Sequence, residues 1–101
     1  MNIKNLESIR GIPYKTKLVL AKELGISPGT VNNRAKEIKE EVLKGRYPNC
    51  SILEDGGLKL INCLVFIDYI NNRQKLLQPN CRKQVEPFDA REIARSIGLY
   101  N

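Results

Sequence analysis

A cluster of polar and small residues between positions 29 and 36 has the side-chain types that suit contacts to a polyanion. The cluster consists of Gly29, Thr30, Asn32, Asn33 and Lys36. An asparagine amide can make a bidentate contact to adenine, and a lysine can reach guanine or a phosphate. A glycine allows the backbone to come close to a ligand. These residue types are suited to reading the edges of bases.

The sequence around the cluster predicts a helix that would present it on one face. Ser27 is a good N-cap residue and Pro28 suits the first helical turn, so we expect a helix from residue 28 to about 43. The apolar residues of this stretch recur at i, i+4, i+7 and i+11: Val31, Ala35, Ile38 and Val42. At about 100° per residue from Val31, four residues of the cluster lie between roughly 100° and 200°, namely Gly29, Asn32, Asn33 and Lys36. We therefore expect Gly29, Asn32, Asn33 and Lys36 to point away from the core.

A shorter helix is predicted just before this one. Residues 16–24 place apolar side chains on one face, namely Leu18, Leu20, Ala21 and Leu24. Gly25 then supplies the left-handed residue that commonly ends a helix. The result is two amphipathic helices joined by a short turn.

The charge of the chain also favours a polyanionic partner. The formal net charge is +6, from 17 Lys and Arg against 11 Asp and Glu, and nucleic acid is the most common partner of small basic proteins. No acidic residue occurs between positions 28 and 36, and a helix N-terminus itself favours a phosphate. Glu40 and Glu41 indicate that the helix leaves the anion by its third turn. Six residues are expected at phosphates: Lys15, Thr16, Lys17, Lys22, Ser27 and Lys39.

The stretch "LAKELGISPGTVNNRAKEI" resembles the helix-turn-helix of small bacterial DNA-binding proteins. Ala21, Gly25 and Val31 stand where that motif has a small residue, a turn glycine and a buried aliphatic residue. The resemblance implies that residues 17–24 brace the second helix. It also implies that the second helix enters the major groove of DNA.

A hairpin and a third helix are predicted next. Residues 51–53 and 58–61 are expected to form strands around an Asp-Gly turn. Asn62 can cap a helix over residues 63–77, whose Leu64, Ile67 and Ile70 would pack inward, with or without Phe66. Helix-turn-helix, hairpin and helix over residues 15–75 are similar to the winged-helix layout of excisionases and MerR-type domains.

In that layout the hairpin is a wing that often touches DNA. The wing residues implied here are Arg46, Gly56, Gly57 and Lys59. The tip departs from the pattern, because Glu54 and Asp55 would repel phosphate. Two roles remain open for the wing: it touches DNA despite these acids, or it only covers the core.

The C-terminal part is expected to be a linker followed by a helix. We divide the chain into a winged helix-turn-helix domain, residues 1–77, and a linker with a C-terminal helix, residues 78–101, for docking or dimerisation. Asp89 and Glu92 have the spacing of a capping box, and Ala90, Ile93 and Ile97 would form the apolar face. Residues 73–83 hold four cations and no acid, so they are either a phosphate-binding strip or a solvated linker. At the N-terminus, Ile3, Leu6 and Ile9 would form a helical turn or two.

The sequence offers little for catalysis, so we do not expect an enzyme. It has no histidine and no P-loop or G-x-S-x-G motif. Its three cysteines are widely spaced, which predicts neither a disulfide framework nor a zinc site, and no cofactor is expected. Asp68 lies in an apolar helix and is either a buried acid or, as is more common, on an exposed face or paired with Arg34 or Arg73. Cys63 is expected in the core. The same cysteine pattern predicts a reduced, cytoplasmic location. The longest apolar stretch is too short to span a bilayer.

Two functions follow as expectations. The first is a sequence-specific DNA-binding protein, either a transcriptional regulator or an excisionase. Its partners would be double-stranded DNA and further copies of the chain, as a homodimer or an array. The chain also resembles short proteins encoded by phages and other mobile elements of Gram-positive bacteria, including the ending "PFDAREIARSIGLY". The second function is a protein-interaction module on the same fold, such as a phage-encoded inhibitor of a host protein, in which the acidic wing and the C-terminal helix would matter more than the helix over residues 28–43.

Overall fold

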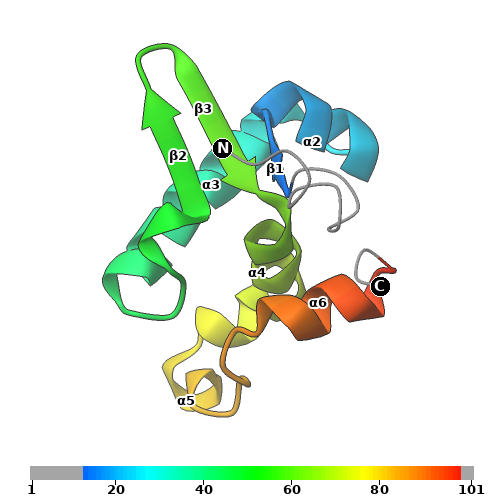
Figure 1. Cartoon of the computed structure of the whole chain (residues 1–101). Helices are drawn as coiled ribbons and strands as arrows, with labels where there is room; N and C mark the ends of the chain where they lie inside the picture. The colour runs from blue at the N-terminus through cyan, green and yellow to red at the C-terminus, as the bar shows by residue number, and fades with distance from the viewer. Residues whose placement is uncertain (1–12, 99–101) are drawn as a thin grey trace.

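The computed structural model describes residues 13–98, and Figure 1 shows their arrangement. Helices dominate, and a small antiparallel sheet of three strands has the order β1-β3-β2. A mainly α fold with a small hairpin is confirmed at this level. In chain order the elements are β1 (Tyr14–Lys15), α2 (Lys17–Leu24), α3 (Pro28–Leu43), the 3-10 helix η1 (Asn49–Ser51), β2 (Ile52–Asp55), β3 (Leu58–Asn62), α4 (Cys63–Leu76), α5 (Pro79–Arg82) and α6 (Ala90–Ser96).

The first two helices form where the capping residues predicted them. The Thr16 hydroxyl accepts a bond from the backbone N–H of Val19, and α2 ends at Gly25 with a φ of 70°. The Ser27 hydroxyl accepts a bond from the N–H of Thr30 at the start of α3. Both helix boundaries are therefore set by local sequence.

The hairpin is longer than predicted, and a third strand joins it. Glu54 pairs with Lys59 and Asp55 with Leu58 across β2 and β3, so both acids belong to a strand rather than to the turn. Gly56, with a φ of 59°, and Gly57 make the turn alone. On the other edge of β3, Tyr14 pairs with Asn62, which the sequence did not predict because this contact is made across nearly fifty intervening residues.

Helix α4 runs through the middle of the molecule, between α3 and α6 (Figure 1). Its inward face is only partly the predicted one. Leu64 and Phe66 are buried as predicted and Ile67 is half-buried, but Val65 and Tyr69 are buried as well and Ile70 is 44% exposed. The prediction followed a single stripe, whereas a central helix is covered on several sides. In α2 the predicted inward residues Leu18 and Leu24 are likewise exposed, whereas Leu20 and Ala21 are buried as predicted. The buried apolar residues are Leu20, Ala21, Val31, Ala35, Ile38, Tyr47, Ile61, Cys63, Leu64, Val65, Phe66, Tyr69, Leu76 and Ala94.

The C-terminal helix α6 packs against α4 of the same chain. Asp89 caps it by accepting bonds from the N–H groups of Arg91 and Glu92. Ala94 is the buried residue of α6 and Ile93 is half-buried, whereas the predicted inward residues Ala90 and Ile97 are exposed. Before α6, the rings of Phe88 and Tyr47 pack in a T-shaped arrangement with centroids 5.2 Å apart.

One prediction concerns residues near the N-terminus. Ile3, Leu6 and Ile9 lie outside the described residues, so the predicted N-terminal helical turns are not addressed. Within residues 13–98, each helix is too short or too polar to cross a bilayer.

Candidate nucleic-acid interface

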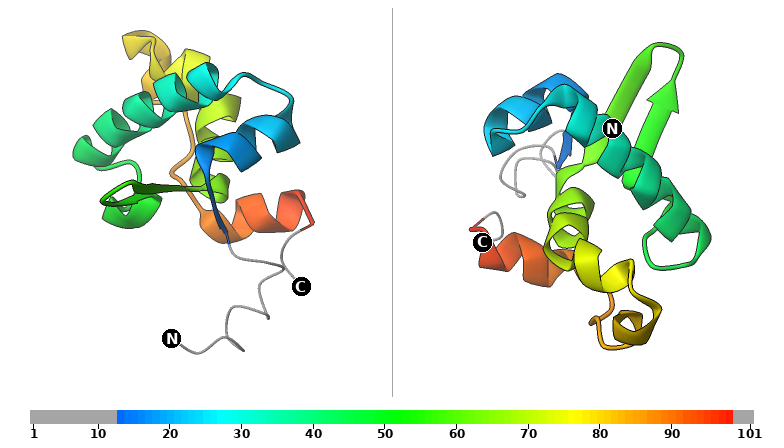
Figure 2. Two further views of the ribbon diagram at one scale, coloured as in Figure 1. Left: turned by 90° about the horizontal axis from the view of Figure 1, so that it is seen from above. Right: turned by 180° about the vertical axis from the view of Figure 1, so that it is seen from behind.

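The predicted base-reading residues lie on α3, which runs along the surface in the rear view of Figure 2. Gly29, Asn33 and Lys36 are exposed, whereas Val31, Ala35 and Ile38 on the opposite side of the helix are fully buried. Helical spacing thus brings the three exposed residues together over the first two turns. An added Cβ at Gly29 would meet only the Ser27 hydroxyl, at 3.9 Å. The backbone is therefore accessible at this point.

The other two predicted base-reading residues make contacts within the protein. The Thr30 hydroxyl lies 2.9 Å from the Ser27 hydroxyl and forms part of the helix cap. The Oδ1 atom of Asn32 accepts a bond of 3.3 Å from the Lys59 Nζ. Both residues are half-buried. They therefore lie at the flanks of α3 and not on its exposed face with Gly29, Asn33 and Lys36.

The hairpin lies along one flank of α3 and is fixed there by two contacts. One is the Lys59–Asn32 bond, and the other is an ion pair between Lys39 and Glu54. The ammonium group of Lys39 lowers the pKa of the Glu54 carboxyl. Lys39, predicted at a phosphate, therefore already has an anionic partner. The hairpin braces α3 while its tip, Gly56 and Gly57, remains exposed.

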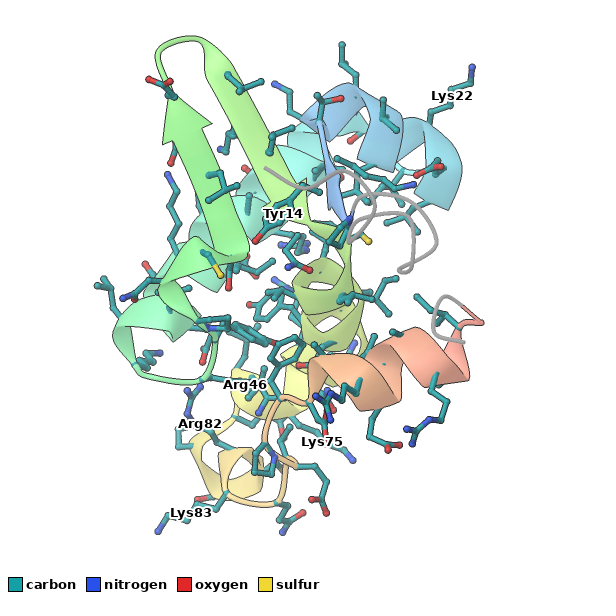
Figure 3. All side chains as sticks on the ribbon, in the orientation of Figure 1. Tyr14, Lys22, Arg46, Lys75, Arg82 and Lys83 are labelled. Carbon is teal, nitrogen blue, oxygen red and sulfur yellow. The ribbon has the colours of Figure 1, made fainter. Side chains whose placement is uncertain are left out.

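Arg46, one of the implied wing residues, does not lie on the wing. Figure 3 places it well below the hairpin, near the centre of the molecule. Its guanidinium donates to Asp68 at 2.8 Å and to the backbone oxygen of Glu86 at 2.9 Å. Asp68 is buried, which was one of the alternatives, but its partners are Arg46 and Tyr47 and not Arg34 or Arg73. The sequence did not reveal this pair because a tertiary fold is needed to bring the loop after α3 to α4.

The opposite flank of α3 carries two acids, each neutralised by arginines. Glu37 accepts bonds from Arg34, Arg73 and the Tyr69 hydroxyl, at 2.7–2.8 Å for the shortest bond of each. The bonds from Arg73, followed by those from the other partners, lower the pKa of Glu37.

Glu41, which is almost fully buried, accepts two bonds from Arg82, and these lower its pKa. Arg73 and Arg82 belong to the cationic strip of residues 73–83, for which the sequence offered a phosphate-binding role or a solvated linker. Neither role fits these two arginines, because each forms an ion pair with a glutamate of α3. Lys75 and Lys83 of the same strip are exposed (Figure 3).

The cations left near the exposed face of α3 are few. Lys15 pairs with Glu23 at 2.6 Å. Lys17, Lys22 and Lys36 are exposed, and none of them forms an ion pair with another residue of the described range 13–98. Lys22 points out from α2 into solvent (Figure 3). Of the predicted phosphate-binding residues, Thr16 and Ser27 serve as helix caps, and Lys17 and Lys22 remain available as cations.

The remaining reactive groups do not form a second site. Cys63 is buried, and its burial raises the pKa of the thiol, whereas Cys50 is exposed and Cys81 is half-buried. In the described part of the chain, no three His, Cys, Asp or Glu side chains are grouped so that they could hold a metal ion.

Comparison of the chain with protein-family models, with curated proteins and with solved structures gives no match. The functional argument therefore depends on the geometry of α3 and its neighbours.

Proposed function

We propose that this chain is a winged helix-turn-helix protein that binds double-stranded DNA in a sequence-specific manner. The observation that carries the proposal is the exposed face of α3, where Gly29, Asn33 and Lys36 lie together and no acid occurs in the first two turns. The acids on the flank of α3 are held by arginines and so add little negative charge. Glu40 lies on the same face one turn later and sets the end of the contact.

The dimensions of α3 suit the major groove of DNA. An α-helix with its side chains is about 10–12 Å across, and the major groove is about 12 Å wide. With α3 in the groove, Asn33 would read an adenine and Lys36 a guanine or a phosphate. Lys17 and Lys22 of α2 would bind the backbone phosphates beside the groove.

The hairpin would occupy the position of the wing, but it would not make the contact with DNA that a wing usually makes. Its flank toward α3 carries Glu54 and Lys59, which hold α3 through Lys39 and Asn32. Its tip brings Asp55 close to any phosphate in reach, which is unfavourable. We therefore assign the hairpin to bracing α3, with Lys59 alone near enough to the α3 face to help with a phosphate.

On this proposal, the DNA-binding protein has one of two biological roles. A transcriptional regulator would bind a palindrome as a two-fold dimer. An excisionase would bind direct repeats as an array and bend the DNA. Either role would belong to a phage or mobile element and act in the cytoplasm, and either needs more than one copy, because so few cations give a single copy low affinity.

The test is a selection of duplexes from a random library by the full chain, followed by anisotropy titrations of the selected and a scrambled duplex at two salt concentrations. The proposal expects an enriched sequence, tighter binding to it and steep salt dependence. The spacing and orientation of repeats in the selected sites would separate a regulator from an excisionase. No enrichment and no binding at low salt would contradict the proposal.

One observation favours a protein-interaction module as the second candidate. Leu53 and Leu58 of the hairpin are 40% and 51% exposed, and Asp55 lies beside them. An apolar and acidic surface of this kind suits contact with a protein. Replacing Asn33 and Lys36 by alanine distinguishes the two candidates, because a protein-interaction module would keep its function.

A further inference from the structure

The hairpin has one face toward α3 and one toward solvent. Glu54 and Lys59 contact α3, and side chains alternate along a strand. The opposite face of the hairpin therefore carries two cross-strand pairs, Leu53 with Leu60 and Asp55 with Leu58. We call these four residues the hairpin face. Leu53 and Leu58 are largely exposed, and Leu60 is half-buried.

Asp55 gives the hairpin face a free negative charge. It forms no ion pair with the residues described here, whereas its neighbour Glu54 is paired with Lys39 on the other side of the hairpin. An edge strand with exposed leucines favours association with another surface. The matching surface should be apolar with a surplus of positive charge.

A groove with these properties lies on the other flank of α3. It has a volume of about 590 Å³ and is formed between the α2–α3 corner and α4. Its apolar lining includes Leu24, Ile26, Ile67 and Ile70, and Leu24 and Ile70 are 42% and 44% exposed. We call this surface the corner groove.

The corner groove carries a surplus cation. Arg34 and Arg73 both line it, and the two guanidinium groups share the single carboxylate of Glu37. Two positive charges against one negative charge leave about one positive charge in excess. Ile70 and Arg73 are one helical turn apart, so an apolar and a cationic group lie next to each other, as Leu58 and Asp55 do on the hairpin face.

The two surfaces lie on opposite sides of α3. From Val31 at 0°, the hairpin contacts Asn32 and Lys39 lie at about 100° and 80°, whereas Thr30 and Arg34 of the groove lie at about 260° and 300°. One copy cannot bring its own hairpin face to its own groove. A second copy can, and the contact would leave the face of α3 between the two flanks uncovered.

We infer that the hairpin face of one copy docks in the corner groove of the next. Leu53 and Leu58 would cover Leu24 and Ile70, and Asp55 would approach Arg73 and Arg34. The two surfaces differ, so the contact is heterologous and each bound copy offers a further free hairpin and a further free groove. Association should therefore continue beyond two copies as concentration rises, to an open chain or a closed ring, with or without DNA.

Sedimentation equilibrium without DNA tests this inference, using two variants that change only exposed positions. The hairpin variant is Leu53→Gln with Leu58→Gln, and the groove variant is Leu24→Gln with Ile70→Gln. The control is Leu43→Gln, at an 87% exposed position on α3 outside both surfaces. Circular dichroism melting of each variant establishes that it remains folded.

For the wild type and the control, we expect a mass that rises with concentration above the 11.5 kDa of one chain. Each variant alone should stay at the mass of one chain. An equal mixture of the two variants should reach twice that mass and stop, because only one intact hairpin and one intact groove can meet. The inference is overturned if the wild type stays monomeric, if either variant associates as the wild type does, or if the mixture remains monomeric.

The outcome is separate from that of the DNA proposal. A wild-type chain that stays monomeric but binds DNA would overturn only the hairpin and groove contact. Loss of DNA binding with self-association retained would overturn only the proposed function.

Discussion

The guanidinium of Arg46 and the carboxylate of Asp68 lie 2.8 Å apart in the interior, although 22 positions separate them in the chain. Both side chains are more than nine-tenths buried. The Tyr47 hydroxyl donates to the same carboxylate oxygen, at 2.7 Å. This pair joins the loop that follows α3 to the central helix α4, and so fixes the end of α3.

Replacing Asp68 by alanine should destabilise the protein strongly. The change leaves the buried Tyr47 hydroxyl and one guanidinium nitrogen of Arg46 without their carboxylate acceptor, although Arg46 keeps its bond to the Glu86 backbone oxygen. Breaking a buried pair from one side costs about 3–5 kcal/mol. Chemical denaturation followed by circular dichroism measures the free energy of unfolding. Asp55→Ala, at an exposed acid on the hairpin, is the matched control and should change it by about 0.5 kcal/mol or less. A loss for Asp68→Ala as small as the control's would contradict a structural role for this pair.

Much of the fold can be predicted from sequence because its boundaries are set locally. Gly25, Ser27, Asn62 and Asp89 each cap a helix where the sequence predicted a cap, whereas Thr16 caps α2 although it was expected at a phosphate. A cap requires only residues within the same turn.

Other features depend on contacts between distant segments and were predicted wrongly or missed. Arg46 looked like a wing residue because it follows α3, and only the packing of α4 shows its partner. Ile70 looked buried because the spacing of apolar residues in α4 suggests a one-sided helix. Strand β1 is two residues long, so no periodicity could reveal it. The pairing of Arg73 with Glu37 crosses 36 positions and leaves no local pattern.

Replacing Arg82 by methionine should destabilise α3 by leaving Glu41 without its main partner. The Glu41 side chain is only 4% exposed, and an unpaired buried group of this kind costs about 1–3 kcal/mol. Urea unfolding of the variant measures the loss. Glu41→Gln combined with Arg82→Met should recover part of it, because no charge is then left alone. A double variant with the sum of the two single losses would show that the pair is not coupled.

Stability should fall at acid pH, in part through Glu37 and Glu41. Arg73 and Arg82 lower the pKa of these carboxyls below the ordinary value of 4.5. A carboxyl with a lowered pKa in the folded state contributes stability that is complete above its unfolded pKa and is lost as pH falls through the folded value. The free energy of unfolding should therefore decline below about pH 5. Urea unfolding as a function of pH should show a shallower acid decline for Glu37→Gln with Glu41→Gln, and an unchanged decline would contradict this assignment.

Neutralising Glu54 should strengthen DNA binding. Its carboxylate lies beside the proposed interface and pairs with Lys39. Glu54→Gln removes this negative charge and frees Lys39 for a phosphate, while Asp55 is left unchanged on the hairpin face. Anisotropy titration should give a lower Kd, and the slope of log Kd against log salt should steepen by about one if Lys39 then binds a phosphate. Glu86→Gln, at an exposed acid far from α3 in sequence, is the control, and a higher Kd for Glu54→Gln would mean that this acid favours binding.

The measurement that tests the DNA proposal most directly compares the affinity of two double variants for the same selected duplex. One is Asn33→Ala with Lys36→Ala, on the exposed face of α3. The other is Lys75→Ala with Lys83→Ala, which removes two exposed cations far from that face. The first should lose about 1–3 kcal/mol of binding through Asn33, discriminate less between duplexes and have a salt slope smaller by about one, while it remains folded. The second should bind nearly as the wild type does. Equal losses in the two variants, or no loss in the first, would contradict DNA recognition by α3.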